Sequence, residues 1–212
     1  MPNLHANLID SLQGVGWDPE RTYSAPWQSG LTGIAYNKSK VKEVRSFEEL
    51  LTRSDLRGRI SLLTEMRDTM GLIMLTEGAD PADFDQDDWD NAIDRLRKAR
   101  NDGQVRAFTG NDYIQDLSAG NILACEAWSG DVAAAEDENL VFVSPEEGQM
   151  IWSDNMLIPN LATHQATPRS GSTTTTTRRW PRSSRRTSGT SARSRVPRRR
   201  WRRSIPASST TS

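Results

Sequence analysis

The sequence predicts an α/β fold for residues 1–165 and a disordered tail for residues 166–212. In the first part, short apolar runs alternate with amphipathic stretches, a pattern typical of strands that alternate with helices. Glycines follow two of the amphipathic stretches, at positions where helices usually stop. Charge changes at the boundary, because residues 1–165 hold all 28 acidic residues against 14 basic ones, whereas the tail holds 13 arginines and no acid.

Six short segments are predicted as strands because each is an apolar run bounded by polar or turn-forming residues. In chain order they are Ile34–Tyr36, Arg59–Thr64, Val105–Phe108, Asn121–Cys125, Leu140–Val143 and Met150–Ile158. The strand over Asn121–Cys125 is expected to end where Glu126 opens a more polar stretch. No segment repeats at a fixed period, so a solenoid or propeller is not expected.

Five segments between these strands are predicted as helices. In chain order they are Ser46–Leu51, Asp68–Glu77, Asp87–Asn101, Tyr113–Ala119 and Ser129–Glu136. Ser46 is placed to cap the first of them, with Glu49 at the capping-box position. Gly78 and Gly120 are the expected stops of the second and the fourth.

The longest predicted helix follows an acidic linker over Pro81–Asp88. Within the helix, Trp89, Ile93 and Leu96 recur at i, i+4 and i+7, so they form one apolar face. Basic residues gather toward its C-terminal end, where they complement the helix dipole.

Several classes of protein are excluded by composition. The longest apolar run, Leu72–Leu75, is too short to span a membrane. The first twenty residues lack a basic segment followed by an apolar one, so we expect no signal peptide in this chain. Cys125 is the only cysteine, and the two histidines, His5 and His164, lie far apart, so neither an internal disulfide nor a metal site is expected. A Gly-rich phosphate loop is also missing, and we expect no cofactor.

The tail over residues 166–212 has two interpretations. Of its 47 residues, 21 are Ser or Thr and 13 are Arg, so it cannot bury enough surface to fold. Such a tail could be an arm for nucleic acid, but the acidic first part argues against that partner. The favoured interpretation is a frameshift. Every Thr codon begins with AC, so the run Thr173–Thr177 read one base earlier encodes residues such as Tyr and Asp, and Ser172–Arg178 can conceal Asp-Tyr-Tyr-Tyr-Asp-Pro.

Acids and tryptophans follow the ends of several predicted strands. Glu65 and Asp68 come after one strand, Trp128 after another, and Trp152 and Asp154 lie in the last extended stretch. Ligands of open α/β sheets bind outside the carboxyl ends of strands. Carboxylates suit cationic groups, and indole rings suit both methylenes and cations. The group therefore predicts a site for a cation with an apolar body. There are two alternatives: each tryptophan packs in the core, and the acids are solvent-exposed residues at the start of a helix.

Four stretches carry a resemblance to a known family. They are Tyr23–Asn37, Leu62–Asp68, Ala127–Asp131 and Ile151–Pro159. In order and spacing the chain resembles, over about residues 3–165, the polyamine (spermidine/putrescine) substrate-binding proteins of bacterial ABC importers. The resemblance implies a type II periplasmic-binding-protein-like fold of two lobes that close on the ligand. It also implies that the chain begins near the end of the first lobe and consists of the hinge and mainly the second lobe.

The resemblance assigns roles to the five residues. It implies that Glu65 and Asp68 take an ammonium end of the polyamine, that Trp128 packs on its carbon chain, and that Trp152 and Asp154 hold the other part. It further implies capture without catalysis, ABC transporter permease subunits as partners, no nucleic acid, a monomer, and a periplasmic or extracellular lipid-anchored location. Another cationic solute or a carboxylate-based hydrolase remains the alternative.

Overall fold

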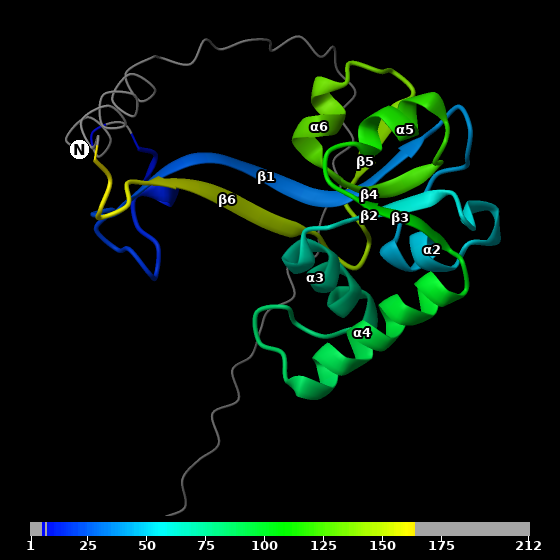
Figure 1. The fold of residues 1–212 in the computed structure, drawn as a ribbon, viewed down its shortest axis with the longest axis horizontal. Coiled ribbons are helices and arrows are strands. Elements are labelled where there is room, and N and C mark those ends of the chain that lie inside the picture. The colour runs from blue at the N-terminus through cyan, green and yellow to red at the C-terminus, as the bar shows by residue number, and fades with distance from the viewer. Residues whose placement is uncertain (1–5, 7, 164–212) are drawn as a thin grey trace, which may run out of the picture.

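The computed structural model describes residue 6 and residues 8–163, which form an α/β fold (Figure 1). The predicted tail lies outside the described residues. The strands are β1 (Ser24–Asn37), β2 (Ile60–Leu63), β3 (Val105–Thr109), β4 (Ala124–Trp128), β5 (Leu140–Val143) and β6 (Met150–Leu157). The helices are α2 (Phe47–Thr52), α3 (Met66–Glu77), α4 (Gln86–Asn101), α5 (Tyr113–Ala119) and α6 (Ser129–Ala134), with short 3-10 turns at Asp10–Leu12 and Ser54–Leu56. None of these helices is long and apolar enough to cross a membrane.

The six strands form one sheet in which β1 is shared by three partners. The order is β3-β2-β4-β1-β5, and β6 pairs with the other half of β1. β2 is parallel to β3 and β4, whereas β1 is antiparallel to β4, β5 and β6. Thr32 lies between Trp128 of β4 and Met150 of β6. We call β6 with β1 residues 24–31 the ribbon, and the rest of the sheet with its helices the body. Figure 1 shows the ribbon extending away from the body.

Helices cover both faces of the body. α2, α3 and α4 lie on one face, and α5 and α6 lie on the other (Figure 1). Successive side chains of a strand point to opposite faces. Ile34 therefore joins a core with Phe47 and Ile73, whereas Ala35 joins a core with Leu117. All five side chains are fully buried. This double cover explains why the body strands are nearly continuous apolar runs.

The predicted helix ends are occupied by the expected residues. The Ser46 hydroxyl accepts a hydrogen bond from the Glu49 amide at 3.0 Å, which caps α2. The Glu49 carboxylate accepts from the Arg45 amide, one residue before the position that a capping box requires. Gly78 and Gly120 end α3 and α5 in the left-handed region, with φ of 85° and 78°. Glycine adopts this conformation without the strain that a Cβ would cause.

The predicted bounds of the fourth strand are wrong. We predicted Asn121–Cys125, but β4 runs from Ala124 to Trp128. Asn121 belongs to the turn after α5, where its amide donates to the Asp116 carbonyl at 2.8 Å. Glu126, which we expected to end the strand, lies inside it and is fully buried.

The first predicted strand is much longer than expected. The apolar run Ile34–Tyr36 marks only the buried end of β1, which begins at Ser24. The residues between them are mixed in polarity and partly exposed. Their strand conformation depends on pairing with β6, which is distant in the sequence. A local pattern therefore could not show the full length of β1.

Candidate functional site

The carboxyl ends of three parallel strands meet at one edge of the body. β2, β3 and β4 run in the same direction, so their last residues lie along the same edge. α3 begins directly after β2, and α6 begins directly after β4. Two of the predicted site residues, Asp68 and Trp128, lie at this edge, on the first turn of α3 and at the end of β4. The helix N-terminus favours a carboxylate there.

Asp68 is the centre of a buried hydrogen-bonded junction. Asp68 as a whole residue is only 6% exposed to solvent. Oδ2 accepts from the Thr32 hydroxyl at 2.7 Å and from the indole Nε1 of Trp128 at 3.0 Å. Oδ1 accepts no hydrogen bond from the described residues. The junction fixes the carboxylate between α3, β1 and β4 and leaves one oxygen with free acceptor capacity.

Trp128 is held from the opposite side by Tyr113. The Trp128 amide donates to the Tyr113 hydroxyl oxygen at 2.9 Å, and the two rings meet edge to face with centroids 6.3 Å apart. Tyr113 in turn donates to Asp131, which also accepts from the Asn111 side chain at 3.0 Å. Burial raises the pKa of the Tyr113 hydroxyl, so it stays a neutral donor. The half-buried indole therefore has a fixed orientation.

Glu126 is a fully buried carboxyl group two residues before Trp128. Its Oε2 accepts from the Leu63 amide at 2.9 Å and from the Thr69 hydroxyl at 2.7 Å, whereas Oε1 is buried with no hydrogen-bond partner among the described residues. Burial raises its pKa to about 8, and the two hydrogen bonds oppose this while Asp68 adds to it. The adjacent Cys125 thiol has a raised pKa for the same reason, burial.

Trp152 and Asp154 lie on the ribbon. Trp152 pairs with Gly30, where a Cβ would come within 2.5 Å of the indole, so glycine is needed for the ring to lie against β1. The Trp152 Nε1 is buried and finds no acceptor among the described residues. Asp154 is exposed, and its Oδ2 accepts from the Gln28 amide group at 3.1 Å.

The register places three predicted residues on the face of the sheet that Asp68 of α3 contacts. Paired residues of antiparallel strands point to the same face, as do residues two apart on a strand. Thr32 pairs with Trp128, and Gly30 pairs with Trp152. Trp128, Trp152 and Asp154 therefore share the face from which Thr32 reaches Asp68. Trp152 stands two residues along β1 from this junction, which is about 7 Å.

Glu65 is separated from this arrangement. It is exposed and caps α3, because its Oε1 accepts from the Arg67 amide at 3.3 Å. Sequence reasoning missed Thr32, Glu126 and Gln28. Nothing in the local sequence around Thr32 indicates a contact with Asp68, whereas Glu126 stands out as the one acid in the apolar strand β4. In the part of the chain that the structure describes, no group of acids, histidines and cysteine could hold a metal ion.

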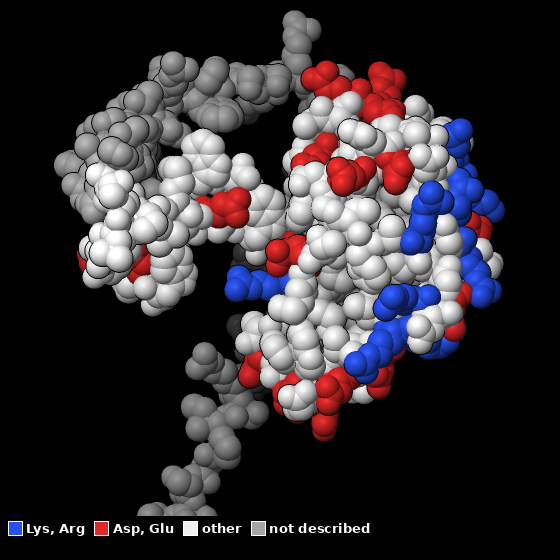
Figure 2. All heavy atoms as spheres, viewed as in Figure 1, with Lys and Arg blue, Asp and Glu red and all other residues white. Residues whose placement is uncertain are grey.

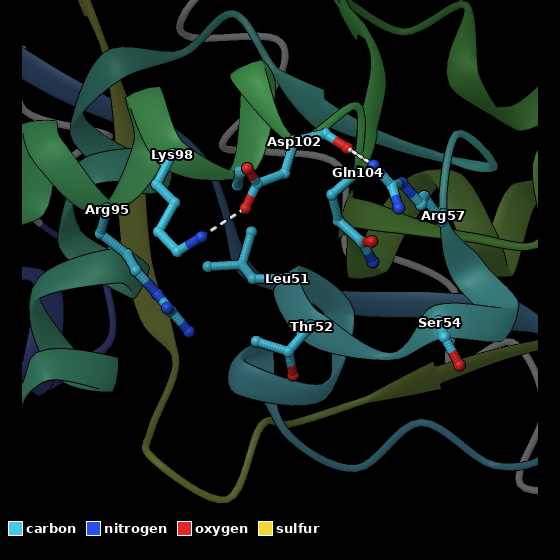
Figure 3. Close-up of a pocket in the computed structure, with 9 residues that line it drawn as sticks. Leu51, Thr52, Ser54, Arg57, Arg95, Lys98, Asp102 and Gln104 are labelled. Atoms are coloured by element: carbon cyan, nitrogen blue, oxygen red, sulfur yellow. Dashed lines mark hydrogen bonds and ion pairs between the residues drawn. The ribbon is translucent and has the colours of Figure 1, made fainter.

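A hollow of about 450 Å³ lies at the opposite edge of the body, near the amino ends of β2 and β3 (Figure 3). Its lining includes Arg57, Arg95, Lys98 and Asp102. Lys98 and Asp102 form an ion pair, Arg57 donates to the Asp102 carbonyl, and Arg95 pairs with acids outside the hollow. Figure 2 shows most Lys and Arg on the side of the body turned away from the ribbon, a further basic group where the ribbon meets the body, and Asp and Glu on both the body and the ribbon. The hollow's cations are thus engaged within the protein.

Comparisons with known proteins agree on one family. Residues 3–171 match the family described as bacterial extracellular solute-binding protein. A putrescine-binding periplasmic protein of Escherichia coli is 30% identical, over 67% of this chain and 43% of the relative. A putative spermidine/putrescine ABC transporter structure from Listeria monocytogenes is 28% identical with a TM-score of 0.70, and covers 82% of this chain and 53% of that one. A Treponema pallidum lipoprotein structure has a TM-score of 0.73 at 21% identity, over 83% of this chain and 56% of that one, and supports the fold alone. The chain spans about half the length of the relatives it matches.

Proposed function

The chain belongs to the bacterial extracellular solute-binding proteins, and from this premise we propose that it captures a polyamine of the spermidine or putrescine class for import by an ABC transporter. The relatives named for putrescine and spermidine binding support the ligand class. The type II periplasmic-binding-protein fold of its structural neighbours supports the mode of action, which is closure of two lobes around a solute.

One observation carries the proposal: two indoles on one face of the sheet lie between two acids, one on α3 and one on the ribbon. From the body to the ribbon the order is Asp68, Trp128, Trp152 and Asp154. A polyamine alternates ammonium groups with methylene segments. Carboxylates complement the ammonium groups, and indole faces contact methylenes and attract cations.

Within this site Asp68 is the strongest candidate for an ammonium group. Thr32 and Trp128 satisfy only its Oδ2, so Oδ1 is available to a ligand. Burial lowers the local dielectric and strengthens the attraction. Asp154 is exposed, and an exposed ion pair contributes only about 0–1 kcal/mol.

The energetics require the ligand to be enclosed. A micromolar site needs about 8 kcal/mol, which exposed ion pairs cannot supply. The closing of a second lobe over the face would desolvate the ammonium groups. A single lobe that is not covered in this way should therefore bind polyamines weakly.

The proposal includes capture without chemical conversion, action as a monomer, delivery to ABC transporter permease subunits, and a periplasmic or extracellular lipid-anchored location. Names of relatives that describe periplasmic proteins support the location. Another cationic solute would use the same acids and indoles, so the test includes a second class of cation.

Titration calorimetry of the 212-residue chain tests the proposal. Spermidine and putrescine should bind more tightly than lysine, and 1,4-butanediol, which has the methylenes of putrescine without its charges, should not bind. Asp68→Asn should weaken spermidine binding, and Asp87→Asn at the exposed start of α4 should not. Equal affinity for the diamine and the diol, or an unchanged Asp68→Asn variant, would contradict the proposal.

A further inference from the structure

Glu126 lies in the second layer of the proposed site and has no role in the function described above. It is on the same face of β4 as Trp128, because residues two apart on a strand point to one side. Its partner Thr69 is the neighbour of Asp68 on the first turn of α3. Glu126 therefore sits behind both the acid and the indole that would contact an ammonium group.

The surroundings of Glu126 favour a neutral carboxylic acid. The group is fully buried, and no ion pair among the described residues includes it. One of its oxygens, Oε1, is buried without a donor. Leaving an ionised oxygen buried and unpaired is costly, and protonation removes the charge.

The charged groups that face Glu126 are acids. Asp68 and Glu65, at the start of α3, both raise its pKa, and Arg67 on the same turn is exposed. The strand β2 contributes no ionisable side chain. From β1 the only ionisable side chain is Tyr36, and from β4 it is Cys125, whose raised pKa values keep both neutral.

A cation bound at Asp68 would reverse this balance. It would neutralise the nearest negative charge and add a positive one beside Glu126. An opposite charge within about 4–6 Å lowers the pKa of a carboxyl group by about 1–3 units. The proton would then pass from Glu126 to the buffer.

We propose that Glu126 is a proton-exchanging group of the site: it carries a proton in the unliganded chain and releases it to solvent when a polycation binds at Asp68. Binding of the cation is thus coupled to release of a proton, and the affinity of the site for the polycation depends on pH near neutrality. This inference rests on the proposed function. Glu126 does not touch the ligand and acts through Asp68 as a positioning residue that tunes the charge of the site.

The experiment compares the wild-type chain with Glu126→Gln, which has nearly the same shape as the protonated acid and does not titrate. Spermidine affinity is measured by calorimetry at pH 6 and pH 8.5 in buffers with different heats of ionisation. The two chains should bind alike at pH 6. At pH 8.5 the wild type should bind roughly tenfold more tightly than Glu126→Gln, and near pH 7.5, between the free and the bound pKa, it should release more protons per spermidine than the variant does. Neighbouring ammonium groups lower the pKa of the central amine of spermidine, so both chains are measured with the same ligand at each pH and only the difference between them is interpreted.

Each result decides one question. Spermidine binding with equal proton release in both chains overturns the inference and leaves the proposed function intact. Loss of spermidine binding in the wild type overturns the proposed function and the exchange together. Carboxyl carbon NMR of the unliganded wild type tests the protonation by itself: a midpoint near pH 8 supports it, and one below pH 6 overturns it. Glu126→Met, which also does not titrate, replaces the glutamine variant if that variant is misfolded by circular dichroism.

Discussion

The two halves of β1 lie in regions of opposite character. In the body, residues 32–37 are all buried and lie between β4 on one side and β5 and the first residue of β6 on the other. In the ribbon, β1 pairs with β6 alone, and residues 27–29 are partly or largely exposed. Asp68 and Trp128 belong to the first region, where hydrogen bonds and packing fix them. Trp152 and Asp154 belong to the second.

This contrast shows that the proposed site combines a fixed half with an adaptable one. The body half is already in position before a ligand arrives, so little ordering entropy is lost there. The ribbon half is more exposed to solvent, and elements with little buried surface move at a lower free-energy cost. Mutations in the body should therefore affect stability as well as binding, whereas mutations in the ribbon should affect binding almost alone.

The largest difference in stability between a body variant and a ribbon variant should come from replacement of the buried acid Glu126. Glu126 has a pKa of about 8 in the folded chain against an ordinary value near 4.5. Between these values the unfolded chain loses the proton and the folded chain keeps it, so wild-type stability falls as pH rises through this window. From pH 5 to pH 8.5, Glu126→Gln should become more stable than the wild type by roughly 3–4 kcal/mol.

Urea denaturation at the two pH values measures this difference. Asp154→Asn on the ribbon is the matched control, because it also replaces a carboxyl group by an amide, but at an exposed position. A stability gap between Glu126→Gln and the wild type that stays constant with pH would show that Glu126 is ionised in the folded chain.

Truncation of the apolar core should give the next largest difference. Ile34 is fully buried on the body half of β1, and Ile34→Ala should lower the free energy of unfolding by about 3 kcal/mol through lost packing and a cavity. Ile151 on the ribbon is 73% exposed, and Ile151→Ala should cost less than about 0.5 kcal/mol. Urea unfolding followed by circular dichroism compares them. Similar losses would mean that the ribbon is as well packed as the body.

Loss of spermidine affinity should differ between variants of the two acids of the site, Asp68 and Asp154. Asp68→Asn should reduce the spermidine binding free energy by about 2 kcal/mol, because it removes a charge from a buried position. Asp154→Asn, at an exposed position, should reduce it by about 0.5 kcal/mol. Calorimetry on both variants, with Asp87→Asn as control, tests this order. A larger loss for Asp154→Asn would place the main ammonium contact on the ribbon.

The smallest effect should come from the ribbon indole. Trp152→Ala should cost about 1 kcal/mol of spermidine binding through lost contact and cation–π attraction, with little change in stability. Trp89, which is half-buried on α4 and stacks on Phe84, is the control. Trp89→Ala should lower stability and leave the affinity of the folded chain unchanged. If Trp152→Ala instead destabilises the chain and spares binding, Trp152 is a packing residue.

Local signals predicted the parts of the fold that depend on local structure. Helix α5 and strand β5 have the predicted bounds, because Gly120 ends the helix and an apolar run defines the strand. The strand β4 was misplaced because Glu126 looks like a polar boundary. What keeps this acid inside the strand is the Leu63 amide and the Thr69 hydroxyl, which are distant in the sequence.

The same limit applies to the site. Asp68 follows β2 and Trp128 is the last residue of the parallel strand β4, so reasoning from strand ends correctly brought them to one edge. Trp152 lies near them for another reason, the antiparallel register of β6 on β1, which no strand-end rule contains. Thr32 joins the two halves, and its role depends entirely on its position between β4 and β6.

The central place of β1 has a consequence for the order of synthesis. β1 leaves the ribosome before any of its partners exists, since β4, β5 and β6 all come near the end of the described chain. Until then its amide and carbonyl groups and the apolar side chain of Ile34 are open to other chains, a template for aggregation. Pairing over such long sequence separations is also slow. The yield of soluble protein should therefore depend on how well β1 is shielded during translation, more than on the stability of the finished fold.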